Sequence, residues 1–330
     1  ISNNQPEMLV AEQDPPLPID PEQIRVISPG ASNDLAGLTA MQPMEKATDS
    51  DRHYLLPLPP GPLPRPTPAG CYVTGAALFI RVAALRAHFQ PLIPGFYDRE
   101  KAGPFNYSEL ILKRLETFPQ DRAGIERVSK SFRAMAQPAR ESFEAAFGPM
   151  GQLPPIILLH TLGEMDGGVR TMKATGRTLL FGADVIAKNH LEHGIQPFFH
   201  HELFHVFHER SFQDCNAVWC GLWTEGLAVY VAERLNPGAT DAQLLLVNPV
   251  PLRAAVDANR REALCAVLAR LDSTDSDDIG ALFSSGRISD TLPPRAGYYI
   301  GYLVAAEAGR TRNLNLLAAL PAEQVRPLVE

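Results

Sequence analysis

Apolar residues recur at three- and four-residue intervals through residues 71–147, for example in "AALFIRVAALRAHF" and "YSELILKRLETF". This spacing puts the apolar side chains on one face of a helix, so the sequence predicts a helical region here. Ser108 stands where a helix N-cap is expected, Pro138 predicts a kink, and Gly148 marks the end of the last helix. No residue of this region suggests a reaction.

The pattern changes after residue 150. The run "PPIILLH" (154–160) is short and rich in β-branched and apolar residues, which predicts a strand, and "RTLLFGADVI" (177–186) predicts a second one. The glycine-rich stretch "GEMDGGVRTMKATG" between them predicts a turn-rich loop. Helical periodicity then returns over residues 214–235 and 298–308.

Residues 1–70 differ from the rest of the chain. They are polar and end in "LPLPPGPLPRPTPAG", where proline fixes φ and removes amide donors. The composition predicts an extended segment that contributes no core element, either a tether or strap or a ligand for a proline-binding module. A chain shortened to begin near Ala69 should therefore still bind metal.

Composition and charge narrow the function classes. Apolar residues make up 45% of the 330 residues and charged residues 20%, which is an ordinary globular balance. The net charge of -7 and the lack of a long Lys/Arg run argue against a nucleic-acid partner. The longest apolar stretch, residues 73–85, contains Arg81 and falls short of the ~20 residues that span a bilayer, so no membrane span is expected.

Four cysteines permit disulfides without requiring them. Cys215 and Cys220 lie close together, but no second pair stands at zinc-ribbon spacing. We therefore expect a structural role for them rather than a metal site. A periplasmic or secreted location is slightly favoured over the cytoplasm.

Four of the nine histidines fall in "HHELFHVFH", residues 200–208. Within it, residues 201–205 read H-E-x-x-H, a zinc signature. Positions i and i+4 share one face of a helix, so His201 and His205 can bind one ion while Glu202 projects beside it. The other residues of this helix are largely apolar, which indicates a buried helix where unpaired imidazoles would be costly.

A third ligand is needed to complete such a site. A metzincin would have Gly at position 208 and His at 211, but the sequence has His208 and Ser211, which excludes that class. Glu225 follows His205 by twenty positions, in the otherwise apolar stretch "WTEGLAVY", and a gluzincin places its third ligand at such a spacing. His201, His205 and Glu225 are therefore the predicted metal ligands, with Zn²⁺ as the cofactor.

These residues give the chain a resemblance to gluzincin metallopeptidases of the peptidase-MA-like group. Within that group it resembles a family of predicted zinc-dependent proteases, defined as a domain of unknown function, that has a glutamate in an E-G-x-A-x-Y context and a later G-Y-x-x-G-Y segment. The matching segments here are "EGLAVY" (225–230) and "GYYIGY" (297–302). The resemblance covers residues 71–330 and departs at Val229, where many gluzincins have an acid; Asp184 is a weak alternative for orienting the histidines.

The resemblance implies an α+β, mostly α, zincin-like domain with a small twisted sheet over the H-E-x-x-H helix. Its parts would be a helical subregion (71–150), the sheet with the zinc-binding helices (151–235) and a helical C-terminal part (236–330). It also implies that residues 178–183 form the edge strand that pairs with an extended substrate. Tyr298, rather than Tyr299 or Tyr302, is the expected oxyanion donor.

The implied activity is hydrolysis of peptide bonds in a peptide or protein substrate, by a zinc-bound water that Glu202 activates. Two other functions stay open. One is a zinc-binding scaffold without turnover, although coordination alone would not need Glu202. The other is a zinc hydrolase that acts on a non-peptide amide, since the same ligands would serve that reaction.

Overall fold

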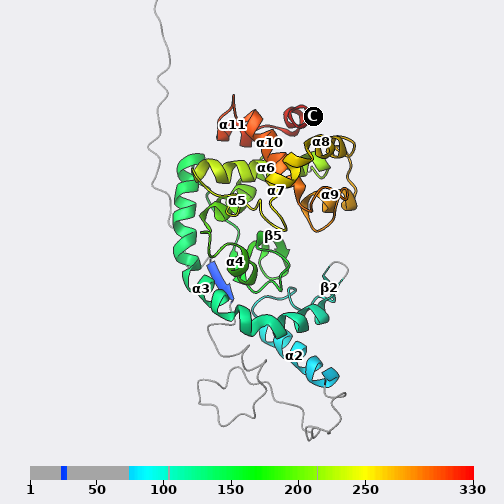
Figure 1. The fold of residues 1–330 in the computed structure, drawn as a ribbon. Coiled ribbons are helices and arrows are strands. Elements are labelled where there is room, and N and C mark those ends of the chain that lie inside the picture. Colours follow the sequence, from blue (N-terminus) through cyan, green and yellow to red (C-terminus); the bar gives the residue numbers. More distant parts are fainter. Residues whose placement is uncertain (1–23, 28–73, 103–104, 214) are drawn as a thin grey trace, which may run out of the picture.

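A four-stranded mixed sheet lies among helices in this computed structural model, which describes residues 24–27, 74–102, 105–213 and 215–330 (Figure 1). The strand order is β1-β4-β6-β5, in which β1, β4 and β6 run parallel and β5 runs antiparallel to β6. The strands are β1 (Ile24–Ile27), β4 (Ile156–Leu159), β5 (Gly167–Met172) and β6 (Gly176–Gly182), and a separate pair is formed by β2 (Lys101–Ala102) and β3 (Phe105–Asn106).

Helices make up most of the described chain, which confirms an α+β class that is mostly α. Those before the sheet and next to it are α2 (Thr74–Phe89), α3 (Tyr107–Phe147), α4 (Ala183–Asn189), α5 (Gln196–His208) and α6 (Val218–Leu235). The C-terminal ones are α7 (Leu252–Ala258), α8 (Arg260–Leu268), α9 (Ser276–Phe283), α10 (Ala296–Ala308), α11 (Leu314–Ala318) and α12 (Ala322–Val329). None of the helices in the described ranges has both the length and the apolar character that a membrane crossing requires.

The long helix α3 curves along one side of the molecule and beneath it (Figure 1). Its N-cap is Asn106, whose side chain accepts hydrogen bonds from the amides of Ser108 and Glu109, so the predicted cap at Ser108 is wrong by two residues. Pro138 lies inside this continuous helix. The helix ends, as predicted, at Gly148, whose φ of 84° is easily adopted only by glycine.

The sheet is buried where its strands are most apolar. Every residue of β4 is buried, and its partners in β6 are Leu179, Leu180, Phe181 and Gly182. A strand covered on both faces needs a continuous apolar run rather than an alternating one, which is what "IILL" and "LLF" supply. Helix α5 packs against this layer, because Phe198 and Phe199 contact the Phe181 ring.

The edge strand next to α5 is β5 rather than the predicted residues 178–183, because residues 178–182 lie in the interior strand β6 and Ala183 begins α4. The sequence did not predict β5 because "GGVRTM" is rich in glycine and has no apolar alternation. The Asp166 carbonyl accepts a hydrogen bond from the Gly182 amide. Backbone direction alternates along an antiparallel strand, so the amide and carbonyl groups of Gly167 and Val169 point away from β6.

Residues 24–27 form β1, which pairs in parallel with β4 at the opposite edge of the sheet. The sequence analysis expected no such element between residues 1 and 70. The proline-dense residues 57–68 and Cys71 lie outside the described ranges.

We therefore expect a chain shortened to begin near Ala69 to bind zinc with the stoichiometry of the full chain, but to unfold at a lower temperature. Removal of β1 uncovers the backbone groups of β4, the strand with which it pairs, and leaves both α5 and α6 in the chain. Metal content and thermal unfolding of two shortened chains, beginning at residue 24 and near residue 69, test this. Loss of zinc from the shorter chain would show that β1 supports the metal site.

Helices α6 and α10 cross in direct backbone contact. A Cβ on Gly226 would overlap the backbone of Gly301, and a Cβ on Gly301 would overlap the Leu222 carbonyl. Only glycine allows the two helices to approach so closely. This crossing fixes the residues next to it, Glu225 on α6 and Tyr298 on α10, relative to each other.

Candidate metal centre

The helix that carries the histidines is buried almost all round. Pro197 occupies its first turn, where a missing amide donor is harmless, and phenylalanines follow it. His201 is 3% exposed and Glu202 is 5% exposed. The largely apolar helix thus holds these polar side chains against the neighbouring helix α6.

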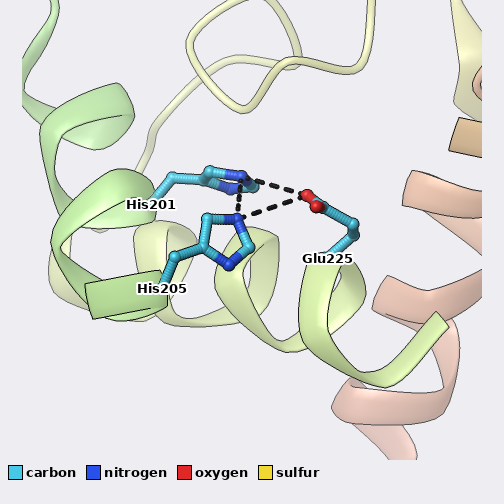
Figure 2. Close-up of side chains that lie close together, drawn as sticks. All are labelled: His201, His205 and Glu225. Atoms are coloured by element: carbon cyan, nitrogen blue, oxygen red, sulfur yellow. Dashed lines mark hydrogen bonds and ion pairs between the residues drawn. The ribbon is translucent and has the colours of Figure 1, made fainter. Parts of the chain in front are cut away.

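His201, His205 and Glu225 come together as predicted (Figure 2). The two Nε2 atoms are 3.0 Å apart, and each lies 3.3 Å from Oε2 of Glu225. Donor atoms at three corners of a tetrahedron around zinc, with bonds of about 2.0–2.1 Å, are separated by about 3.3–3.4 Å. The three atoms therefore match the spacing that one metal ion requires.

Burial and charge also favour a cation at this position. Oε2 of Glu225 is buried and makes no hydrogen bond within the described residues. Burial raises the pKa of Glu225, but His205 and His201 lower it more, so the pKa lies well below its ordinary value. A carboxylate that stays charged beside two imidazole nitrogens is a suitable third ligand.

Glu202 faces the same cavity from α5 without belonging to the ligand set. Burial raises the pKa of its carboxyl to about 8. A Cβ on Gly167 would lie 2.7 Å from the Glu202 carboxyl carbon, so the glycine at the start of β5 leaves space for this side chain. Glu202 is therefore placed between the edge strand and the ligand histidines, with a pKa suited to proton transfer near neutral pH.

Tyr298 also lines the cavity, and its ring stacks on His201 with 6.2 Å between the centroids. Burial raises its pKa above the ordinary value, so the phenol stays protonated and can donate a hydrogen bond. The hydroxyls of Tyr299 and Tyr302 donate to Asp257 and Glu233 instead. Neither of these two tyrosines lines the cavity.

The two flanking histidines do not belong to the three-residue group, although His208 lines the same cavity. His200 contacts the Ala139 carbonyl with Nε2 and accepts from the Asn236 amide with Nδ1, and burial lowers its pKa to about 4. His208 stacks between the rings of Phe204 and Phe212. Burial lowers its pKa to about 3, so both imidazoles are neutral.

At position 229, where the resemblance leads us to expect an acid that orients a histidine, the chain has valine. Val229 is fully buried in the core, and Nδ1 of His201 has no hydrogen-bond partner among the described residues. Asp184 accepts hydrogen bonds from Thr161 and from the Gly163 amide, so it caps a loop rather than contacting His201 or His205. Packing, including the Tyr298 ring, holds His201 in position.

A disulfide joins Cys215 and Cys220 in the segment that leads from α5 into α6. This agrees with a structural role for the pair. Cys215 also lines the cavity, whereas Cys265 is a free, exposed thiol on α8.

The cavity measures about 410 Å³, and the lining residues that the sequence did not single out include Asp166, Gly167 and Arg295. Asp166 contacts Nε2 of His190 at 3.0 Å and accepts from the Gly167 amide. Nothing in the sequence marks these positions, because each is a single residue in a loop or at an element boundary and forms no spaced motif. Only the fold brings them to the ligand histidines.

Comparison with known proteins adds no assignment. No protein-family model, no curated protein and no solved structure matches this chain. The geometry of the site therefore carries the functional argument.

Proposed function

We propose that the protein is a zinc-dependent peptidase with a zincin-like fold, in which His201, His205 and Glu225 bind the metal and Glu202 transfers protons. The main support is that three donor atoms with zinc-like spacing share a cavity with Glu202. This buried acid does not belong to the group of candidate ligands. A site that only bound metal would have no use for this acid.

Zinc bound at these atoms would supply Lewis acidity, which acidifies water and polarises a carbonyl. Glu202 would accept the proton of the attacking water and pass it to the leaving amine, a role that its raised pKa suits. Tyr298 would donate a hydrogen bond to the oxyanion as it develops, because its phenol stays protonated.

An extended substrate would pair with the free edge of β5. Val169 presents an outward-pointing amide and carbonyl there and Gly167 an outward-pointing carbonyl, whereas the Gly167 amide donates to Asp166. Pairing of this kind recognises the backbone, so it favours a peptide over a small amide as the substrate.

The test is to strip the protein of metal, restore zinc, and screen it against quenched peptides. We expect one zinc per chain by elemental analysis, a higher unfolding temperature in the zinc form, and turnover that only the zinc form shows. Zinc binding without any peptide turnover would favour the non-catalytic scaffold, and the absence of zinc after reconstitution would contradict the metal centre.

Tyr298→Phe should lower kcat by roughly a hundred- to a thousandfold while zinc content stays normal, since one oxyanion donor contributes about 2.7–4 kcal/mol. The matched controls are Tyr299→Phe and Tyr302→Phe, whose hydroxyls bind Asp257 and Glu233 outside the cavity. A wild-type rate in Tyr298→Phe would remove this residue from the mechanism.

A further inference from the structure

Arg295 is a cation in the metal cavity that has no carboxylate partner. It lines the cavity at the start of α10, and its guanidinium carbon lies 4.4 Å from the centre of the Tyr298 ring. Within the part of the chain that the structure describes, Arg295 forms no ion pair with Asp or Glu. An arginine held against an aromatic face keeps its planar donors available for another group.

The acids around it already have partners. Asp166 contacts His190, Glu209 forms an ion pair with Arg177, and Glu225 faces the two ligand histidines. Burial lowers the pKa of the Arg295 guanidinium, but Tyr298, Asp166 and Glu225 raise it more through space, and no described carboxylate forms a direct ion pair with it. A guanidinium binds a carboxylate with two parallel hydrogen bonds, which is its most specific form of recognition.

The backbone of Arg295 provides a second, independent observation. Its φ of 65° and ψ of 15° lie in the left-handed region, where the Cβ of an L-residue is strained. Glycine or asparagine would begin the helix after this turn at lower cost. An arginine kept in such a conformation inside a cavity indicates that its side chain has a function there.

The distance from the metal site limits where a bound group can lie. The guanidinium lies 4.4 Å from the Tyr298 ring centre, and this ring lies 6.2 Å from that of His201. The guanidinium is thus at most about 11 Å from the His201 ring, a span of roughly three extended residues.

We propose that Arg295 determines substrate specificity by binding a carboxylate of the substrate, within about three residues of the bond that is cut. This rests on the proposed peptidase function and narrows its substrates to peptides with an acidic side chain or a free C-terminus near that bond. Arg170, on β5, also lines the cavity but is exposed, and we assign it no part in this recognition.

Binding of peptide hydroxamates to the zinc-loaded protein, measured by calorimetry, tests the proposal without turnover. In the first pair, one peptide has a free C-terminal carboxylate and the other has a C-terminal amide. In the second pair, both peptides have a C-terminal amide, and one contains Asp where the other contains Asn. We expect the carboxylate member of at least one pair to bind about 10- to 100-fold more tightly, and the pair that shows the preference identifies the source of the carboxylate.

Arg295→Gln should abolish the preference for the carboxylate member of a pair and leave the affinity of the member without that carboxylate unchanged. Arg295→Gly serves as a second variant, because glycine fits the left-handed backbone and should fold at least as well while losing the same preference. Arg170→Gln is the matched control and should keep it.

Equal binding within both pairs, or a preference that survives in both Arg295 variants, would overturn the role of Arg295 and leave the peptidase proposal standing. Failure of every hydroxamate to bind the reconstituted protein would instead overturn the peptidase proposal, and this inference with it.

Discussion

Glu202→Gln is expected to bind one zinc per chain and to hydrolyse peptides roughly a hundred- to ten-thousandfold more slowly than the wild-type protein. Glutamine has nearly the same shape as glutamate, so it fits the space beside Gly167, but it cannot accept a proton. Glu202 lies outside the three-atom ligand set, so the metal should stay. Elemental analysis and initial rates on one peptide measure the two effects separately.

His205→Ala is the comparison for this variant. It removes a ligand, so we expect loss of both zinc and turnover, together with a lower unfolding temperature, because metal binding stabilises the folded state. If Glu202→Gln lost zinc as severely as His205→Ala, the division between ligand and proton acceptor would be wrong.

Gly226→Ala is expected to destabilise the fold by about 1–3 kcal/mol or more and to weaken zinc binding. The added methyl group would overlap the backbone of Gly301, and helix backbones cannot move aside as a flexible side chain can. If α6 moved away from α10, Glu225 would move with it, because it directly precedes Gly226 on α6. Thermal unfolding with and without zinc, and the zinc affinity of the variant, measure both consequences.

Gly280→Ala on α9 provides the matched control. A Cβ at Gly280 meets no atom within 4 Å, so the same substitution should stabilise the protein by about 0.5–1 kcal/mol through better helix propensity. A Gly226→Ala variant as stable as the wild type, with unchanged zinc affinity, would show that the helix crossing does not hold the site together.

The sequence predicted that the three candidate ligands come together, because the information for this is local and periodic. His201 and His205 are four positions apart on one helix, and Glu225 stands out as an acid in an apolar stretch. The structure brings the three side chains together. The helical regions were predictable for the same reason, since three- and four-residue spacing of apolar positions needs no knowledge of the tertiary fold.

The sheet was harder to predict because its edge depends on pairing rather than on pattern. β5 is rich in glycine and β1 lies in a polar, proline-rich segment, so neither has a clear alternation. Arg295 was missed for another reason. A single arginine before a helix carries no periodic signal, and its importance comes from the cavity that other segments build around it.

All three proposed ligands come from residues 201–225, on two consecutive helices, whereas Tyr298 follows Glu225 by more than 70 residues. Closing a short loop costs little conformational entropy and is fast, while long-range contacts form later. The three candidate ligands therefore come from one local unit of two helices, whereas the wall of the cavity that contains Tyr298 and Arg295 depends on a long-range contact with α10.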